Sequence, residues 1–266
     1  MISEQEIINR FLPVSLEEIN SIKNSVKLLK RYDTKFVFRD SKVAALMKNL
    51  LDSYKILEID GKRQFNYENV YFDTADRSFY MQHHNQKLNR YKLRYRKYVD
   101  SRLKFWEIKF KSNKMKTLKD RCEQEYDRTA PSDEMKILTK RVIPEILGID
   151  LDVVKPSLLV RFSRVTLASP ELKERITIDT NISFQNVIGQ ERSLNNVAVT
   201  ELKQHEFSLN SPFVYAAKKQ RIYRKPFSKY CVGMALLNDK IKRNRFKPNL
   251  MFLEKLSGGE VKCLSQ

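Results

Sequence analysis

Residues 89–99 read NRYKLRYRKYV, and this stretch decides the fold because it alternates between two kinds of side chain. On an extended strand, successive side chains point to opposite faces of the sheet. One face would carry Arg90, Lys92, Arg94 and Arg96, and the opposite face would carry Tyr91, Leu93, Tyr95 and Val99, broken only by Lys97. The stretch therefore predicts a β-strand with one strongly cationic face.

The next stretch, KFWEIKFK at residues 104–111, repeats the alternation with Glu107, Lys109 and Lys111 on one face and Trp106 on the other. Period-2 patterns predict further strands at 31–39, 65–73, 119–128, 157–167, 175–184 and 196–204. Helical patterns occupy 76–85, 132–147, 212–220 and 228–237, and Asp40-Ser41 resembles a polar cap before a helix over 43–54. Strands in this order, joined mostly by short links, predict an antiparallel, closed or nearly closed sheet in an α+β domain with flanking helices.

The charged faces are biased in sign. Most sheets simply expose their charged face to water, and that interpretation holds for any single strand taken alone. A soluble surface, however, normally mixes its charges. The acids Asp33, Glu107 and Glu201 each have a lysine two residues on, which places carboxylate and ammonium on one face. If those faces turn inward, the acids suit a divalent cation and the bases suit phosphate oxygens.

The whole chain has 266 residues and a formal net charge of +19, which favours an anionic partner. Charge alone does not choose between nucleic acid, an anionic membrane surface and a phosphate chain. No RNP-like motif or GXXG loop indicates RNA recognition, so we expect no specific nucleic acid. Gly61-Lys62 lacks the upstream glycine of a P-loop.

No repeat or linker divides the sequence, so we expect one domain over 1–266, with a helical extension at 1–30 and a basic, flexible tail at 240–266. The start of the chain lacks a secretory signal, and no apolar run approaches the roughly 20 residues of a membrane span. We therefore expect a cytoplasmic protein. Its three cysteines predict neither a disulfide framework nor a zinc site.

Eight pieces of the sequence, in order, resemble the VTC (vacuolar transporter chaperone) polyphosphate polymerase domain of the wider CYTH and triphosphate tunnel superfamily. They are RYDTKFVF, YFDT at 71, YKLRYRKY, FWEIKFK, SLLVRFSRVTL, RITID at 175, TELK at 200 and PFSKY at 226. Together they span about residues 31–237. The resemblance implies an antiparallel eight-stranded tunnel barrel, lined by basic residues and flanked by helices.

The resemblance also implies roles for residues at the matching positions. Phosphate-binding bases would be Lys35, Arg94, Arg96, Lys109, Arg164, Arg175 and Lys229, with Arg94, Arg96, Lys109 and Arg175 also catalytic. Glu201 would bind Mn²⁺ or Mg²⁺, and Ser228 would add a hydroxyl and helix amides to an anion. The strand pattern adds Lys111 and Lys203 to the substrate-binding set and Glu107 to the metal-binding one.

The sequence departs from the family pattern at three positions. Phe162 stands where the family tends to have a tyrosine, which removes a hydroxyl, and Asp33 stands where glutamate is commoner. Arg161 and Arg164 lie on opposite faces of one strand, and the motif register favours Arg164 as the inner one.

These features predict an enzyme that transfers the γ-phosphate of ATP to a polyphosphate chain in a metal-dependent tunnel. Two alternatives stay open: a metal-dependent triphosphatase or polyphosphate hydrolase, and a non-catalytic polyanion-binding module. The product length, the oligomeric state and the existence of a membrane partner are not set by the sequence. His83 and His84 lie near the end of a predicted helix, where a cation that complements the helix end is the expected role.

Overall fold

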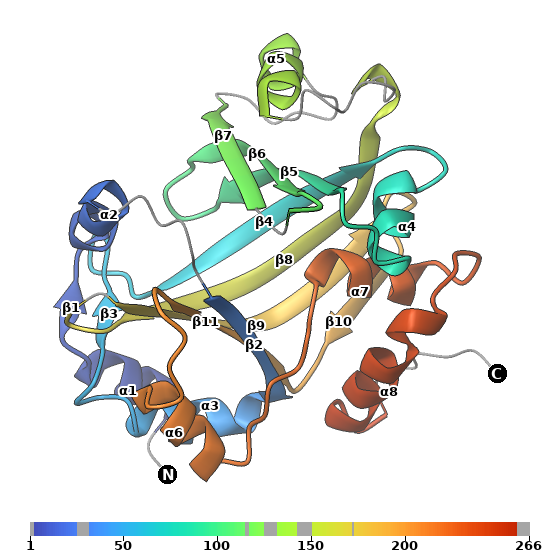
Figure 1. Ribbon diagram of the computed structural model, residues 1–266. Helices are drawn as coiled ribbons and strands as arrows, with labels where there is room; N and C mark the ends of the chain where they lie inside the picture. The colour runs from blue at the N-terminus through green and yellow to red at the C-terminus, as the bar shows by residue number, and fades with distance from the viewer. Residues whose placement is uncertain are drawn as a thin grey trace.

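The computed structural model describes residues 3–25, 32–114, 117–124, 132–142, 151–171 and 173–259. The strands in this part of the chain are β1 (Pro13–Val14), β2 (Tyr32–Arg39), β3 (Lys55–Leu57), β4 (Gln64–Asp73), β5 (Arg90–Tyr98), β6 (Lys104–Lys111), β7 (Thr117–Glu123), β8 (Lys155–Ala168), β9 (Glu174–Asn186), β10 (Glu191–Leu194) and β11 (Val197–Gln204). The helices are α1 (Glu4–Arg10), α2 (Leu16–Ser25), α3 (Val43–Lys48), α4 (Ser78–His84), α5 (Asp133–Val142), α6 (Pro212–Lys219), α7 (Lys229–Leu237) and α8 (Lys247–Leu256) (Figure 1).

The main sheet follows the order β2-β11-β9-β8-β4-β5-β6-β7, and each neighbouring pair is antiparallel. Strand β10 adds to β9 and β3 adds to β8, while β1 pairs with β3 in parallel. The expected α+β class, with an antiparallel sheet and flanking helices, is confirmed. Strands β1, β3 and β10 were not expected from the sequence.

The sheet was expected to be closed or nearly closed, and over the described residues it is not closed into a barrel. Within the described ranges, β2 and β7 end the sheet and do not pair with each other. The free edge of β2 instead pairs with the segment before α7: Phe36 bridges Arg224, and the amide of Lys225 donates to the carbonyl of Lys35 at 2.8 Å. This segment uses backbone groups that a closing strand would need.

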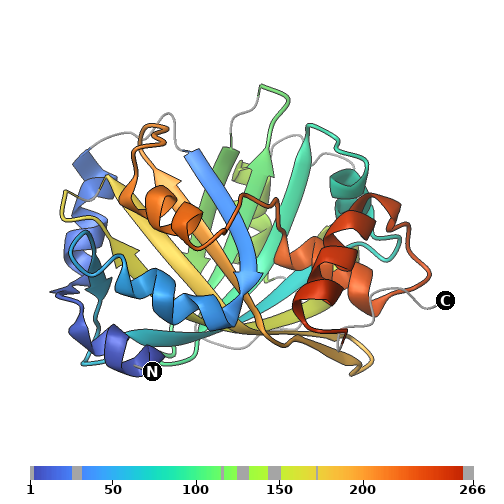
Figure 2. The ribbon, with the colours of Figure 1, turned by 90° about the horizontal axis from the view of Figure 1, so that it is seen from below.

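The sheet nevertheless curls, so that its two halves face each other. The charges of Lys35 and Asp33 on β2 and of Glu201 on β11 act on the pKa of Lys109 on β6. These residues therefore lie close together, although their strands are far apart in the strand order. Figure 2, seen from below, shows β2 in front of the green strands of the other half. We call the concave side, which carries these residues, the inner face.

Two apolar cores cover the outer face. Under α1, α3 and α6, one core packs the outer side chains of β2, β8, β9 and β11, including Phe36, Leu167 and Ile176. The other lies under α5, where the buried Trp106 donates its indole N–H to Thr139 at 3.2 Å. The flanking helices expected from the sequence thus cover the apolar outer strand faces, and Trp106 lies beneath one of them.

A third core lies on the inner face, where α7 packs against β8 and β9. The sequence of α7 is apolar all round, as expected for a helix that is buried on every side. Gly233 permits this approach, because an added Cβ would lie 2.5 Å from Cδ1 of Phe184 and 2.7 Å from Cδ2 of Leu158. The helix thus occupies part of the concave side and brings its first turn towards the charged residues.

Two local expectations were wrong. A 3₁₀ turn at Asp40–Lys42 precedes α3, whose cap makes no side-chain hydrogen bond, and α3 ends at Lys48 instead of running to residue 54. The expected flexible tail contains α8, whose Leu250 and Leu253 are buried in the inner core beside α7. Apolar side chains at helical spacing fold this segment onto the domain; residues 260–266 lie outside the described part. None of the described helices is long and apolar enough to cross a membrane.

Candidate functional site

The strand alternation brings most of the expected site residues to the inner face. Tyr71 on β4, Arg94 on β5 and Glu107 on β6 lie side by side in the strand register. Glu201 on β11 and Thr177 on β9 are likewise cross-strand neighbours, as are Asp179 on β9 and Arg164 on β8. The result is a surface that carries many cations and a few carboxylates.

Glu107 binds two of the three arginines of β5, Arg94 and Arg96. It is almost fully buried, accepts the Nε of Arg94 at 2.6 Å, and lies 3.8 Å from the guanidinium of Arg96. Burial would raise the pKa of Glu107, but Arg94 and Arg96 hold it well below its usual range. Arg96 also donates to Asn69 at 2.8 Å, and Arg94 donates to the hydroxyl of Tyr71 at 3.3 Å. Both guanidinium groups are therefore held in position before any ligand binds.

On the other side of the inner face, Asp179 likewise pairs with two cations. It accepts two hydrogen bonds from Arg164, at 2.5 and 2.8 Å, and one from Lys229 at the start of α7. Burial opposes ionisation, but Arg164 and Lys229 lower the pKa of Asp179 to about 2. The ammonium of Lys229 also lies 4.3 Å from the ring centre of Phe162.

Glu201 lies among the remaining bases. Lys203 on the same strand approaches it to 3.3 Å. Burial would raise the pKa of Glu201, yet Lys203, Lys35 and Arg164 keep it well below its usual range. Glu201 is therefore ionised at neutral pH, as a metal ligand must be.

The bases nearest α7 form a separate group. Lys35 donates to the carbonyl of Phe227 at 2.8 Å, and Lys92 donates to the hydroxyl of Ser228 at 3.2 Å. Ser228 is also the N-cap of α7, where its hydroxyl accepts the amide of Cys231 at 3.3 Å. Lys109 lies opposite Lys92 in the strand register.

The strand register also places other expected site residues. Lys111 lies opposite Arg90 at the end of β6, and Arg175 lies opposite Lys203 at the start of β9. Arg161 pairs with Glu68 at 3.2 Å and points away from Arg164. The two arginines thus lie on opposite faces of β8, as expected.

Phe162, which stands where the family tends to have a tyrosine, is an inner-face residue. Its ring stacks on Tyr67 with centroids 5.1 Å apart and lies 5.0 Å from the guanidinium carbon of Arg164. At this position an aromatic face contacts cations, where a tyrosine would also offer a hydroxyl.

The expectation that His83 is a helix-end cation was wrong. Burial, together with the nearby Lys92 and Arg90, lowers the pKa of His83 to about 2, so the ring is neutral. Its Nε2 lies 3.2 Å from the carbonyl of Tyr91. His84 lies with Nε2 2.7 Å from the side-chain oxygen of Asn244.

The residues present fit a divalent cation only together with a phosphate ligand. Among the described residues, no group of three or more His, Cys, Asp or Glu side chains could hold a metal. Magnesium commonly uses one or two carboxylates and completes its shell with water and substrate phosphates. Glu201 suits this role, and the cross-strand Thr177 presents a buried hydroxyl that has no hydrogen-bond partner in the described part of the chain. Glu107 is already engaged by Arg94 and Arg96.

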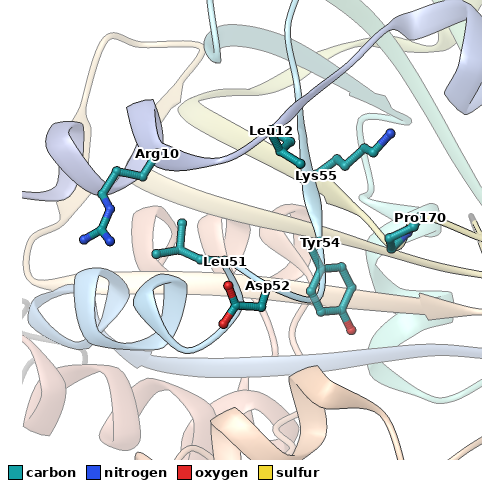
Figure 3. Close-up of a pocket in the computed structure, with 7 residues that line it drawn as sticks. All are labelled: Arg10, Leu12, Leu51, Asp52, Tyr54, Lys55 and Pro170. Carbon is teal, nitrogen blue, oxygen red and sulfur yellow. The ribbon is translucent and has the colours of Figure 1, made fainter.

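A pocket of about 420 Å³ lies outside this constellation, between the end of α1, the segment after α3 and the β8–β9 turn (Figure 3). Arg10 and Lys55 both line it, but Figure 3 shows their charged ends pointing away from each other. The pocket therefore does not converge positive charge on one point, as a phosphate site would.

Asp179 and Lys92 are members of the constellation that sequence reasoning did not select. Asp179 was visible as the inner partner of Arg175 and Thr177 in RITID, but the sequence does not show that it would meet Arg164 and Lys229. Lys92 shares its face with Arg94 at two-residue spacing, and that spacing was the available signal.

Three comparisons with known proteins bear on this chain. A model of the family described as VTC domain matches residues 30–238. No protein with a curated description matches the chain.

Among solved structures, one similar protein is from Hippeastrum, described as a proposed adenylyl cyclase with a dominant triphosphatase activity; it is 17% identical, with 77% of this chain and 95% of that one covered and a TM-score of 0.48. Two others, from Vibrio parahaemolyticus and Bacillus halodurans, are described as proposed adenylate cyclases. They are 11% and 14% identical, cover 74% of this chain and 94% and 95% of their own, and have TM-scores of 0.43 and 0.44. Likenesses of this size carry no argument about activity.

Proposed function

The chain belongs to the VTC domain family, and from that premise we propose that it transfers the γ-phosphate of ATP to a growing polyphosphate chain. Family membership supports an enzyme related to triphosphate or polyphosphate. The acceptor and the direction of transfer are the finer part of the proposal.

The observation that carries the proposal is the gathering of bases on one concave face from elements far apart in sequence. Arg94, Arg164 and Lys229 come from β5, β8 and α7, and each is held by a buried carboxylate. Fixed cations of this kind suit a ligand that has negative charge along its length. Arginine forks in particular match phosphate oxygens in a bidentate manner.

In the proposed reaction, a terminal oxygen of the acceptor chain attacks the γ-phosphorus of ATP. A new P–O bond forms as the bond between the γ-phosphorus and the bridging oxygen breaks, and ADP leaves. Such a transfer depends mainly on alignment and on neutralising charge on the equatorial oxygens. Arg94, Arg96 and Lys109 would bind those oxygens, because their side chains already point into the inner face. A divalent cation at Glu201 would supply further positive charge.

The deciding experiment is a product analysis of the purified protein incubated with ATP and Mn²⁺. A ladder of long phosphate chains is expected. Free phosphate without a ladder would instead indicate a triphosphatase. Tight polyphosphate binding without ATP consumption would indicate a binding module.

Glu201→Gln tests the metal role in the same assay. The change preserves shape and removes the charge of the proposed ligand, so we expect turnover with Mn²⁺ to fall by at least 10²-fold. Glu206→Gln, at an exposed position just beyond β11, is the matched control and should retain turnover. Full turnover by Glu201→Gln would contradict the metal assignment.

A further inference from the structure

Lys92 lies at the centre of the positive charge near α7. It is partly buried on β5, lies opposite Lys109 of β6 in register, and donates to the hydroxyl of Ser228 at 3.2 Å. It thus connects the strand of Arg94 and Arg96 with the first turn of α7. No role follows for it from the family resemblance.

The groups that face Lys92 come from every element around it. They are Arg90 on its own strand, Lys109 on β6, Lys35 on β2, the thiol of Cys231 on α7 and the neutral ring of His83 on α4. Arg94 and Arg164, by contrast, each have a buried carboxylate as a partner. Lys92 is therefore compensated less than these two arginines, while Asp33 and Glu201 act on its neighbour Lys109.

Burial, together with Lys35, Lys109 and Arg90, lowers the pKa of Lys92 to about 8. Desolvation and like charges both disfavour the ammonium form, and an anion would favour it. A phosphate group between Lys35, Lys92 and Lys109 would relieve both effects at once.

We propose that Lys92 is a further substrate-binding residue, which binds a phosphate group of the polyanion beside α7 and takes up a proton as it does so. The inference rests on the proposed function, because its ligand is the triphosphate or polyphosphate of the inner face. It adds a residue to the site and makes binding depend on pH.

The sign of that dependence follows from linkage. A bound anion raises the proton affinity of Lys92, so the complex holds more protons than the free components, and affinity must fall as the pH rises. With a free-state pKa of about 8, most Lys92 side chains are charged at pH 7 and few at pH 9. The contribution of Lys92 to this fall is about tenfold in Kd between pH 7 and 9.

The test is calorimetric titration with sodium tripolyphosphate at pH 7, 8 and 9, at constant ionic strength and without metal. Lys92→Met should bind more weakly than wild type at pH 7, and its loss of affinity between pH 7 and 9 should be about tenfold smaller than that of wild type. Lys92→Arg stays charged over this range, so it should bind more tightly than wild type at pH 9. Lys97→Met, on the opposite face of β5, is the control and should follow wild type.

A purely structural role for Lys92, in holding Ser228, would not change the pH profile. If Lys92→Met binds as tightly as wild type and loses the same affinity between pH 7 and 9, the inference is wrong while the proposed function stands. If wild type binds no tripolyphosphate even at pH 7, the proposed function fails and the inference fails with it. Thermal melting of each variant shows whether it is folded.

Discussion

At the scale of single residues, Glu107 and Asp179 reduce the electrostatic repulsion between the bases of the inner face. Like charges about 8 Å apart repel by roughly 2 kcal/mol at an effective dielectric constant near 20. The sequence alone does not show which acids compensate this repulsion. The structure shows that Glu107 serves Arg94 and Arg96, and that Asp179 serves Arg164 and Lys229. These acids also fix the guanidinium groups in place.

The first prediction concerns the two faces of β5. Arg96→Ala removes a fixed donor but leaves Glu107 paired with Arg94, so we expect kcat/KM for ATP to fall by about 10²-fold to 10³-fold. Arg94→Ala should cost at least as much. Lys97→Ala, on the outer side of the same strand, should change kcat/KM by no more than a few-fold. Equal losses in all three variants would mean that the basic face is only a solvated surface.

The second prediction concerns Asp179→Asn. Removing one member of a buried ion pair typically costs about 3–5 kcal/mol, so the free energy of unfolding at pH 7 should fall by that amount. The pKa of Asp179 is about 2 when folded and about 4 when unfolded, so its stabilisation is present above pH 4 and is lost as the pH falls towards 2. The difference between wild type and variant should narrow over that interval.

Urea unfolding at pH 7, 4 and 3 measures this difference. Asp239→Asn, which removes an exposed carboxylate that pairs with Arg243, is the control and should change stability by less than about 1 kcal/mol. An Asp179→Asn variant as stable as wild type at pH 7 would show that the buried carboxylate does not stabilise the fold.

At the scale of elements, α7 determines how the inner face is completed. The carboxylate of Asp73 accepts hydrogen bonds from the amides of Phe79 and Tyr80 in the first turn of α4, and from the hydroxyl of Tyr230 in α7. The YFDT piece thus ties β4, α4 and α7 together. Ser228 and Lys229 reach the inner face because of where this helix is held.

The third prediction is that Gly233→Ala displaces α7. The new methyl group would overlap the side chains of Phe184 and Leu158, so we expect a loss of about 1–3 kcal/mol in stability. Tripolyphosphate affinity should also fall, because Ser228 and Lys229 move with the helix. Thermal melting and calorimetry measure the two effects. Tyr215→Ala, at an exposed position of α6, should change neither; unaltered affinity in Gly233→Ala would argue against a binding role for the first turn.

At the scale of the whole molecule, the net charge of +19 predicts stabilisation by a polyanion. A ligand at 100 times its Kd adds about 2.7 kcal/mol to the free energy of unfolding, which raises the Tm by roughly 5–10 °C for a chain of this size. Tripolyphosphate at low salt should produce this shift. Orthophosphate at equal phosphate concentration should do much less, because it cannot span several bases. A Tm unmoved by tripolyphosphate would remove the physical basis of the proposed site.

The sequence by itself determined the eight strands of the main sheet, their two faces and the sign of the inner charge. Alternation with period 2 is a local property, so YKLRYRKY and FWEIKFK indicate which side chains share a face without reference to any partner. The placement of Arg164 opposite Arg161, and of Trp106 beneath a helix, followed from the same rule. The helix of 228–237 could also be predicted, because Ser228 is a good N-cap and the residues after it are apolar.

Only the tertiary structure decided which charges meet. The contacts of Asp179 with Lys229, of Lys92 with Ser228 and of Tyr230 with Asp73 join residues 50 to 157 positions apart. The edge of β2 is likewise paired with a segment distant in sequence, the residues just before α7. Local patterns cannot encode such pairings, because they depend on how the sheet curls and where α7 packs. Those same pairings set the pKa of each buried group and the balance of charge on the inner face.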